Sequence, residues 1–204
     1  MFRIINFLTL IRYIAVAATI ISVGAYELLR NYWMSDLPII RILSITPWVV
    51  IVILFFITNK TITRMIWGVM SYFNTSLYPD LNGTWGGEVI FEDGKTIEAR
   101  AVIRQTLLQT QIDLHTATSK SITLETTPAE ESGQLKLYYS YRSSPKNISW
   151  KPYTGSTIFD VRTATQEPKR PLELSGYYFT DRKTTGRVRL QLISKENSAD
   201  VSFY

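Results

Sequence analysis

An uncharged apolar segment near the N-terminus limits the folds that are open to this 204-residue chain. The 18 residues ILSITPWVVIVILFFITN, between Arg41 and Lys60, contain no charged side chain and are rich in Ile, Val, Leu and Phe. A helix of roughly 20 such residues crosses the hydrocarbon core of a bilayer. Pro47 falls near the start, where a missing amide donor costs little, and Trp48 suits the membrane interface. We therefore expect a transmembrane helix here.

A second apolar segment precedes it, from Ile4 to Tyr26. Its polar residues are Asn6, Thr9, Arg12, Thr19 and Ser22. A cleaved signal peptide is the alternative, but the apolar run exceeds the roughly 7 to 15 residues of a signal core. We therefore expect a first transmembrane helix, so that residues 1–60 hold two spans.

Ionisable groups lie in or near the first span. Arg12 interrupts the apolar run and Glu27 follows it directly. Such groups are costly in hydrocarbon and often face a protein interior or a water path. Arg12 and Glu27 are therefore candidates for a role in the membrane or in oligomerisation. The alternative for Arg12 is that its side chain snorkels to the interface.

The excess positive charge of the chain sits beside these spans. Residues 1–78 carry +4 of the net charge of +5. Anionic lipid head groups attract positive charge that lies beside membrane spans. In a nucleic-acid-binding protein, the positive charge would lie on the C-terminal region instead. We expect a lipid bilayer as a partner, and no DNA or RNA. Basic residues are more frequent at the two ends than in the connecting loop, which predicts cytoplasmic ends and a cytosolic C-terminal region.

Residues 61–78 have the pattern of an amphipathic juxtamembrane linker helix. Apolar side chains recur with a helical period at Ile62, Met65, Ile66, Val69, Met70 and Phe73. This helix is expected either to lie on the membrane or to continue the second span as a stalk. Packing against the C-terminal region is a further alternative. Pro79 ends the pattern.

From Asp80 onward the period changes from helical to two, which is typical of strands. Eight such runs follow in about 125 residues, a size at which an antiparallel sheet closes into a barrel. We expect residues 79–204 to form an eight-stranded antiparallel meander barrel, with a sandwich as the less favoured arrangement. The residues predicted to face inward are Leu81, Gly83, Trp85, Gly87, Val89 and Phe91; Ile97, Ala99, Ala101 and Ile103; Ile112 and Leu114; Ile122 and Leu124; Leu135, Leu137, Tyr139 and Tyr141; Thr157, Phe159 and Val161; Leu172, Leu174, Gly176 and Tyr178; and Val188, Leu190 and Leu192.

The composition gives little support to an enzyme. The chain has no cysteine and a single histidine, His115, which falls in the outward strand phase. No nucleophile motif, phosphate-binding loop or metal-ligand spacing is visible, and the carboxylates lie mainly on the outward phase. We therefore predict no catalytic residues, no metal and no cofactor.

The segment Gly83-Thr84-Trp85 on the first strand is similar to the lipocalin signature, in which the indole plugs one end of a small barrel. Together with the two spans and the late segment LSGYYFTDRKTTGRVRLQL, the whole chain resembles the two-transmembrane β-barrel effectors of bacterial cyclic-oligonucleotide-based antiphage signalling systems (CBASS). This resemblance implies a membrane-anchored, lipocalin-like barrel in the cytoplasm that senses a cyclic dinucleotide made by a partner nucleotidyltransferase. It also implies that the protein oligomerises on activation and disrupts the inner membrane. Death of the infected cell by this route is the antiviral defence called abortive infection.

A cyclic dinucleotide requires aromatic faces for two bases and Arg, Lys or hydroxyl donors for two phosphates. Extending the inward phase of the seventh strand gives Tyr178, Thr180 and Arg182 in sequence. The full set of predicted ligand-binding residues is Tyr139, Tyr141, Tyr178, Thr180, Arg182, Lys183 and Arg187. The alternative is that the tyrosines are core residues and the basic residues are solvated. Trp85 is expected to be the structural plug.

Two other functions stay open at this point. A membrane-anchored lipocalin-like carrier of a lipid or another hydrophobic small molecule would need an apolar cavity lining. A structural anchor whose barrel binds protein would have no affinity for small molecules. The lining of the cavity therefore discriminates between a nucleotide sensor and a carrier.

Overall fold

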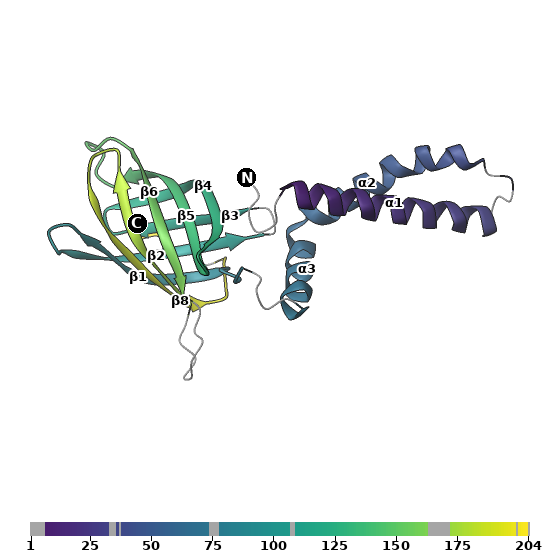
Figure 1. The fold of residues 1–204 in the computed structure, drawn as a ribbon. Coiled ribbons are helices and arrows are strands. Elements are labelled where there is room, and N and C mark those ends of the chain that lie inside the picture. Colours follow the sequence, from purple (N-terminus) through teal and green to yellow (C-terminus); the bar gives the residue numbers. More distant parts are fainter. Residues whose placement is uncertain are drawn as a thin grey trace. The chain divides into compact units, whose positions relative to one another are not determined.

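The computed structural model describes residues 7–32, 36, 38–73, 78–106, 109–162, 172–198 and 200–203, without the side chains of 7–10, 60 and 70–73. It divides into two compact units, Ile4–Ser76 and Leu77–Tyr204 (Figure 1). The first unit is helical and the second is a barrel, and each is described by itself below.

The helical unit contains two long helices that lie side by side. These are α1 (Phe7–Tyr32) and α2 (Ile42–Thr58), with the short 3-10 helix η1 (Ile39–Arg41) before α2 (Figure 1). Ala18, Ser22 and Tyr26 of α1 recur at every fourth residue and are buried. Alanine and serine let two helices approach closely. Two segments, Ile11–Tyr32 and Ile39–Thr58, are long and apolar enough to cross a membrane by length and composition.

A break at Asn59 separates α2 from α3 (Lys60–Phe73). Asn59 has an extended backbone, with ψ of 120°, and its Oδ1 accepts hydrogen bonds from the amides of Thr61 at 3.0 Å and Ile62 at 3.3 Å. This is the geometry of a helix N-cap. The second long apolar helix therefore ends at this residue, and α3 is a separate helix rather than a continuation of α2. Among the described side chains of α3, Thr63 and Trp67 are buried, whereas Met65 and Val69 of the predicted apolar stripe are exposed.

The second unit is a closed barrel of eight antiparallel strands in meander order, as the alternating pattern predicts. β1 pairs with both β2 and β8, which closes the sheet and leaves no edge strand. The strands are β1 (Gly83–Phe91), β2 (Thr96–Gln105), β3 (Thr110–Thr116), β4 (Ser119–Glu131), β5 (Gln134–Pro145), β6 (Tyr153–Arg162), β7 (Glu173–Thr180) and β8 (Thr185–Ser194). The segment between β6 and β7, residues 163–171, lies outside the described residues.

The connections divide between the two ends of the barrel. The β1–β2, β3–β4, β5–β6 and β7–β8 connections share one end, which we call the mouth. The chain enters β1 at the opposite end, the floor, and leaves β8 there as well. The segment from the helical unit therefore joins the barrel at the floor.

The floor is filled by side chains. Trp85 is completely buried, and its indole Nε1 donates a hydrogen bond to the carbonyl oxygen of Leu81 at 2.9 Å. Its cross-strand neighbour in β2 is the small Ala101, which leaves room for the indole. Asn82 and Gln105 bond reciprocally beside it: the Gln105 amide donates to Asn82 Oδ1 at 2.8 Å, and Asn82 Nδ2 donates to the Gln105 carbonyl at 2.9 Å. This is the position that a barrel plug requires.

The predicted inward face is wrong in β4. Ile122 and Leu124 are exposed, and Ser121 points inward instead. Ser121 pairs with Leu114 of β3, which faces inward. This pairing reverses the inward and outward faces that the apolar residues of β4 suggest. A bulge between Thr123 and Glu125 then shifts the register again. Pairing with the neighbouring strands outweighs the side-chain pattern of β4 itself.

Gly87 of β1 lies on the inward face as predicted, because it pairs with the buried Ala99 of β2 and Leu190 of β8, although the glycine itself is exposed. β1 passes very close to β8 here, because a Cβ on Gly87 would lie 1.9 Å from the carbonyl oxygen of Arg189. The position therefore accepts glycine alone without a shift of the backbone. Phe91, at the end of β1, is partly exposed at the mouth.

Candidate ligand-binding site at the mouth of the barrel

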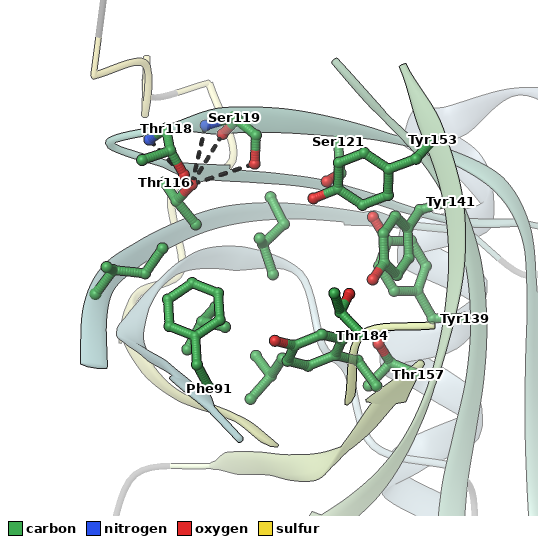
Figure 2. A pocket seen from close by; sticks show the side chains of 15 residues that line it. Phe91, Thr116, Thr118, Ser119, Ser121, Tyr139, Tyr141, Tyr153, Thr157 and Thr184 are labelled. Atoms are coloured by element: carbon green, nitrogen blue, oxygen red, sulfur yellow. Dashed lines mark hydrogen bonds between the residues drawn. The ribbon is translucent and has the colours of Figure 1, made fainter. Parts of the chain in front are cut away.

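A cavity of about 100 Å³ opens at the mouth of the barrel (Figure 2). It is lined by Val89, Phe91, Ile97, Leu114, Thr116, Thr118, Ser119, Ser121, Tyr139, Tyr141, Tyr153, Thr157, Tyr178, Thr184 and Val188. Four of these 15 residues are tyrosines and six are serines or threonines. None of the described lining residues is a lysine or an arginine. The lining is therefore rich in aromatic faces and hydroxyl groups but carries no cation.

Tyr139 and Tyr141 of β5 form an aromatic wall on one side of the cavity, and Tyr153 of β6 lies on the same side (Figure 2). The rings of Tyr139 and Tyr141 stack with centroids 5.1 Å apart, and Tyr139 also stacks on Phe159 at 6.3 Å. The Tyr139 hydroxyl donates to the carbonyl oxygen of Ile112 at 3.2 Å. Tyr139 is thus fixed deep in the wall, while Tyr141 and Tyr153 lie nearer to the mouth.

Two glycines make room for the tyrosine rings. Tyr141 lies opposite Gly155 in β6, and Tyr178 of β7 lies opposite Gly186 in β8. A Cβ on Gly155 would lie 2.5 Å from the Tyr141 ring, and a Cβ on Gly186 would lie 2.6 Å from the Tyr178 ring. Each ring covers its glycine and lies along the barrel wall instead of filling the cavity.

The tyrosine hydroxyls of the wall stay protonated at neutral pH. Burial raises the pKa of Tyr139 well above its usual value, and it raises the pKa of Tyr141 and of Tyr178 as well. Desolvation is the largest cause in all three cases, because it disfavours the charged phenolate. Neutral hydroxyls can donate to carbonyl or phosphate oxygens of a ligand.

A cluster of hydroxyls lies on another part of the lining, at the β3–β4 turn (Figure 2). Thr116 Oγ1 accepts hydrogen bonds from the amides of Thr118 at 3.3 Å and Ser119 at 3.1 Å. It also lies 3.3 Å from the hydroxyls of both residues. Ser121 lies next to this cluster along β4. These groups place several donors and acceptors on one side of the cavity.

The structure places three of the seven predicted ligand-binding residues in the lining: Tyr139, Tyr141 and Tyr178. Thr180 does not line the cavity but contacts a residue that does: its hydroxyl lies 2.7 Å from the hydroxyl of the lining residue Thr184. β7 ends at Thr180, so Arg182 and Lys183 belong to the β7–β8 turn rather than to the strand.

Arg182 lies at the rim of the mouth. Its guanidinium carbon is 4.4 Å from the centroid of the Tyr153 ring, and its Nη2 donates to the carbonyl oxygen of Lys151. Lys183 is exposed and has a positive φ of 61°, in the left-handed region that is used at a tight turn and is uncommon for a residue other than glycine. Both cations are therefore close to the opening but outside the lining.

Arg187 lies on the outer wall of the barrel and not at the cavity. Its guanidinium donates to the Tyr177 hydroxyl at 2.6 Å and lies 4.7 Å from that ring. Gly186 and Val188 flank Arg187, and Val188 lines the cavity, so strand alternation turns Arg187 outward. Arg187 and Tyr177 line a separate groove on the outer surface.

Sequence reasoning missed Tyr153 and the hydroxyl cluster. Tyr153 lies four residues before Thr157 in the same inward phase of β6, and Thr116 continues the phase of Leu114 in β3. Extending each apolar phase to the end of its strand would have found both. Ser119 and Ser121 carried no such indication, because the phase of β4 was misread.

The other predicted residues lie elsewhere. Arg12 is exposed on α1, and Glu27 lies 4.0 Å from Arg30 in an exposed pair on the same helix. His115 is half-buried on the outer side of β3, where burial and then the nearby Lys120 lower its pKa. Among the described residues, no group of three or more His, Asp or Glu side chains is arranged to hold a metal ion.

Residues 76–192 match the sequence profile of a family described as Cap15, cyclic dinucleotide receptor domain. The match covers more than half of the chain and includes every strand that lines the cavity. No curated protein is similar enough in sequence to give a significant match. The matched family is a receptor domain rather than a catalytic one. The chain therefore belongs to the family of Cap15 cyclic dinucleotide receptors, which are CBASS effectors.

Proposed function

We propose that this protein is an antiphage defence effector that binds its cyclic dinucleotide in the mouth cavity and then assembles in the inner membrane. The observation that carries the proposal is the lining of the cavity, where stacked tyrosines stand beside clustered hydroxyls. Base–aromatic stacking and hydroxyl donors are the interactions that a nucleotide uses. Tyr141 and Tyr178 supply aromatic faces, Tyr139 supports the Tyr141 ring from within the wall, and Arg182 and Lys183 supply positive charge at the rim.

The same lining argues against a carrier of lipids. A carrier needs an apolar container, but ten of the 15 lining residues here have a hydroxyl group. A hydrocarbon chain can add no hydrogen bond to these hydroxyls, whereas a polar ligand can. Thr180 contributes to the ligand site only indirectly, because it orients Thr184. Arg187 lies on the outer wall and does not contribute to the ligand site.

The helical unit is proposed to carry out the response. Residues 1–60 would span the inner membrane twice, residues 61–78 would link the spans to the barrel, and residues 79–204 would sense the ligand in the cytoplasm. A partner nucleotidyltransferase supplies the cyclic dinucleotide there. Ligand binding drives homo-oligomerisation only if the assembled state binds the ligand more tightly than the free state. Assembly of the spans then disrupts the membrane.

Arg12 and Glu27 fit a role in that assembly. Both side chains are exposed on α1, at opposite ends of the segment that can cross the membrane. Charged groups at these depths are more stable against a partner helix or a water path than against lipid. No catalytic step, metal or cofactor enters this scheme.

The first test uses the full chain in detergent with a panel of cyclic dinucleotides, linear dinucleotides and fatty acids. A ligand present at 100 times its Kd and specific for the folded state adds about 2.7 kcal/mol of stability, which raises the thermal midpoint by several degrees. We expect a shift with one or two cyclic dinucleotides only. A shift with fatty acids alone would favour a carrier.

The second test reconstitutes the chain in vesicles loaded with a fluorescent dye. The cyclic dinucleotide that shifts the thermal midpoint should cause dye release and a cross-linked ladder of oligomers. The double variant Tyr178→Ala and Arg182→Ala should lose both responses. If this variant still assembles at the wild-type ligand concentration, the proposed site is wrong.

A further inference from the structure

The β5–β6 connection, residues 146–152, presents two large apolar side chains to solvent beside the cavity. Ile148 is 100% exposed and Trp150 is 53% exposed. Large apolar side chains at a loop tip gain nothing from water, and a tryptophan that stays solvent-exposed commonly contacts a ligand or a partner. The loop therefore has a surface that lacks a packing partner within the barrel.

The two ends of this loop are tied to the lining of the cavity. The Lys146 amide donates to the carbonyl oxygen of Thr118 at 2.8 Å, and Thr118 is a lining residue. At the other end, the Lys151 carbonyl accepts a hydrogen bond from Arg182, whose guanidinium also lies over the Tyr153 ring. The loop thus begins and ends at the rim of the cavity.

The tip of the loop is a defined turn. Asn147 Oδ1 accepts hydrogen bonds from the amide and the hydroxyl of Ser149, at 3.0 and 2.8 Å, and the Trp150 amide donates to the Asn147 carbonyl at 3.0 Å. This short-range bonding gives the tip a preferred conformation, so Trp150 is presented at low entropic cost.

The cavity alone is too small for a whole cyclic dinucleotide. Its volume of about 100 Å³ is below the roughly 300 to 1,000 Å³ of pockets that enclose a drug-sized ligand. Its described lining also has no cation for the two phosphates. Lys151, Arg182 and Lys183 are cations on two of the connections at the mouth, and the Arg182 guanidinium lies over the ring of the lining residue Tyr153. The ligand must therefore lie partly inside the barrel and partly at the rim.

We infer that the β5–β6 loop completes the binding site and that Trp150 is a ligand-contacting residue. This inference rests on the proposed function. One base of the cyclic dinucleotide enters the tyrosine-lined cavity, and the phosphates stay at the rim, beside Lys151, Arg182 and Lys183. The second base stacks on the indole of Trp150, and Ile148 covers the outer face of the bound molecule.

The inference is tested with the full chain in detergent. The ligand is the cyclic dinucleotide that wild type binds most tightly in a panel that covers every combination of two bases. Isothermal titration should show an affinity about 5- to 150-fold lower for Trp150→Ala, the range expected for loss of one base–aromatic stack. Trp150→Phe keeps an aromatic face and should stay within about threefold of wild type. Phe179→Ala is the matched control, because Phe179 is 50% exposed on the outer wall of β7.

The outcomes separate this inference from the proposed function. If wild type binds no cyclic dinucleotide, the proposed function fails. If wild type binds and Trp150→Ala binds equally well, the proposed function stands and the loop inference is wrong. Unchanged affinity together with lost ligand-induced cross-linking would assign Trp150 to a contact between two copies, which also overturns the inference. Equal losses for Trp150→Ala and Trp150→Phe would exclude stacking.

Discussion

The ring of Tyr141 occupies the space that a side chain on Gly155, its cross-strand partner, would fill. A Cβ at position 155 would lie 2.5 Å from the Tyr141 ring, and the two residues are directly paired between β5 and β6. The absence of one methyl group on β6 thus decides where a ring of β5 lies. Because Tyr141 also stacks on Tyr139, its position affects the whole aromatic wall.

Gly155→Ala should displace the Tyr141 ring toward the cavity. Overpacking of this kind costs about 1–3 kcal/mol, and the displaced ring should lower ligand affinity at least tenfold. Thermal unfolding and titration of the full chain measure the two effects. In a Tyr141→Ala background the same glycine substitution should cost almost no stability. Equal costs in both backgrounds would show that the two residues do not interact.

Trp85→Phe tests whether the floor indole has only a structural role. The smaller ring leaves a void and loses the bond to the Leu81 carbonyl, so stability should fall by about 1–3 kcal/mol. Ligand affinity should stay within about twofold, because Trp85 is not among the lining residues. A large loss of affinity in a variant that stays folded would make Trp85 part of the ligand site.

Two arginines on the same hairpin should behave differently. Arg182→Ala removes a rim cation and should lower cyclic dinucleotide affinity about tenfold, as expected for one charge-assisted hydrogen bond. Arg187→Ala changes the outer wall, where its guanidinium bonds Tyr177, and should leave affinity within about twofold. Titration at two salt concentrations adds a check, since only the Arg182→Ala variant should bind with a weaker salt dependence.

Alkaline pH should destabilise the barrel through its buried tyrosines. Burial raises the pKa of Tyr139 and Tyr141 above the ordinary value of 10.0. Below pH 10 these phenols are protonated in both the folded and unfolded states, so they add no pH dependence. Above pH 10 the unfolded chain loses protons that the folded barrel keeps, and the free energy of unfolding falls. Chemical denaturation between pH 8 and 11 should show a shallower fall for Tyr141→Phe than for wild type.

Sequence alternation predicted the barrel well because most strands bury one face. In β5, for example, Leu137, Tyr139 and Tyr141 are all buried, as their spacing predicts. β4 was misread because its apolar residues, Ile122 and Leu124, lie on the outside. Its phase depends on pairing with Leu114 of β3 and on a bulge opposite β5, and neither can be read from the side-chain pattern of β4 itself.

The site was predicted less completely than the fold. Tyr139, Tyr141 and Tyr178 follow from strand phase alone, and they do line the cavity. Arg182 was assigned to a strand but lies in a turn, because Asp181 turns back to β6 and its carboxylate accepts hydrogen bonds from the amide and hydroxyl of Thr154. When a side chain ends a strand by hydrogen bonding to another strand, the alternation of apolar and polar residues in the sequence does not show it.

β1 connects the cavity directly to the rest of the chain. Val89 and Phe91 line the cavity at one end of this strand, and Gly83, at the other end, follows the segment that leads from α3. The eight residue steps between Gly83 and Phe91 correspond to about 26 Å of extended chain. β1 cannot slide along its axis without breaking its ladders to both β2 and β8. Under the proposed function, ligand binding at the mouth would therefore be passed to the chain before β1 as a tilt or rotation of the whole barrel, because the closed sheet moves as one stiff body.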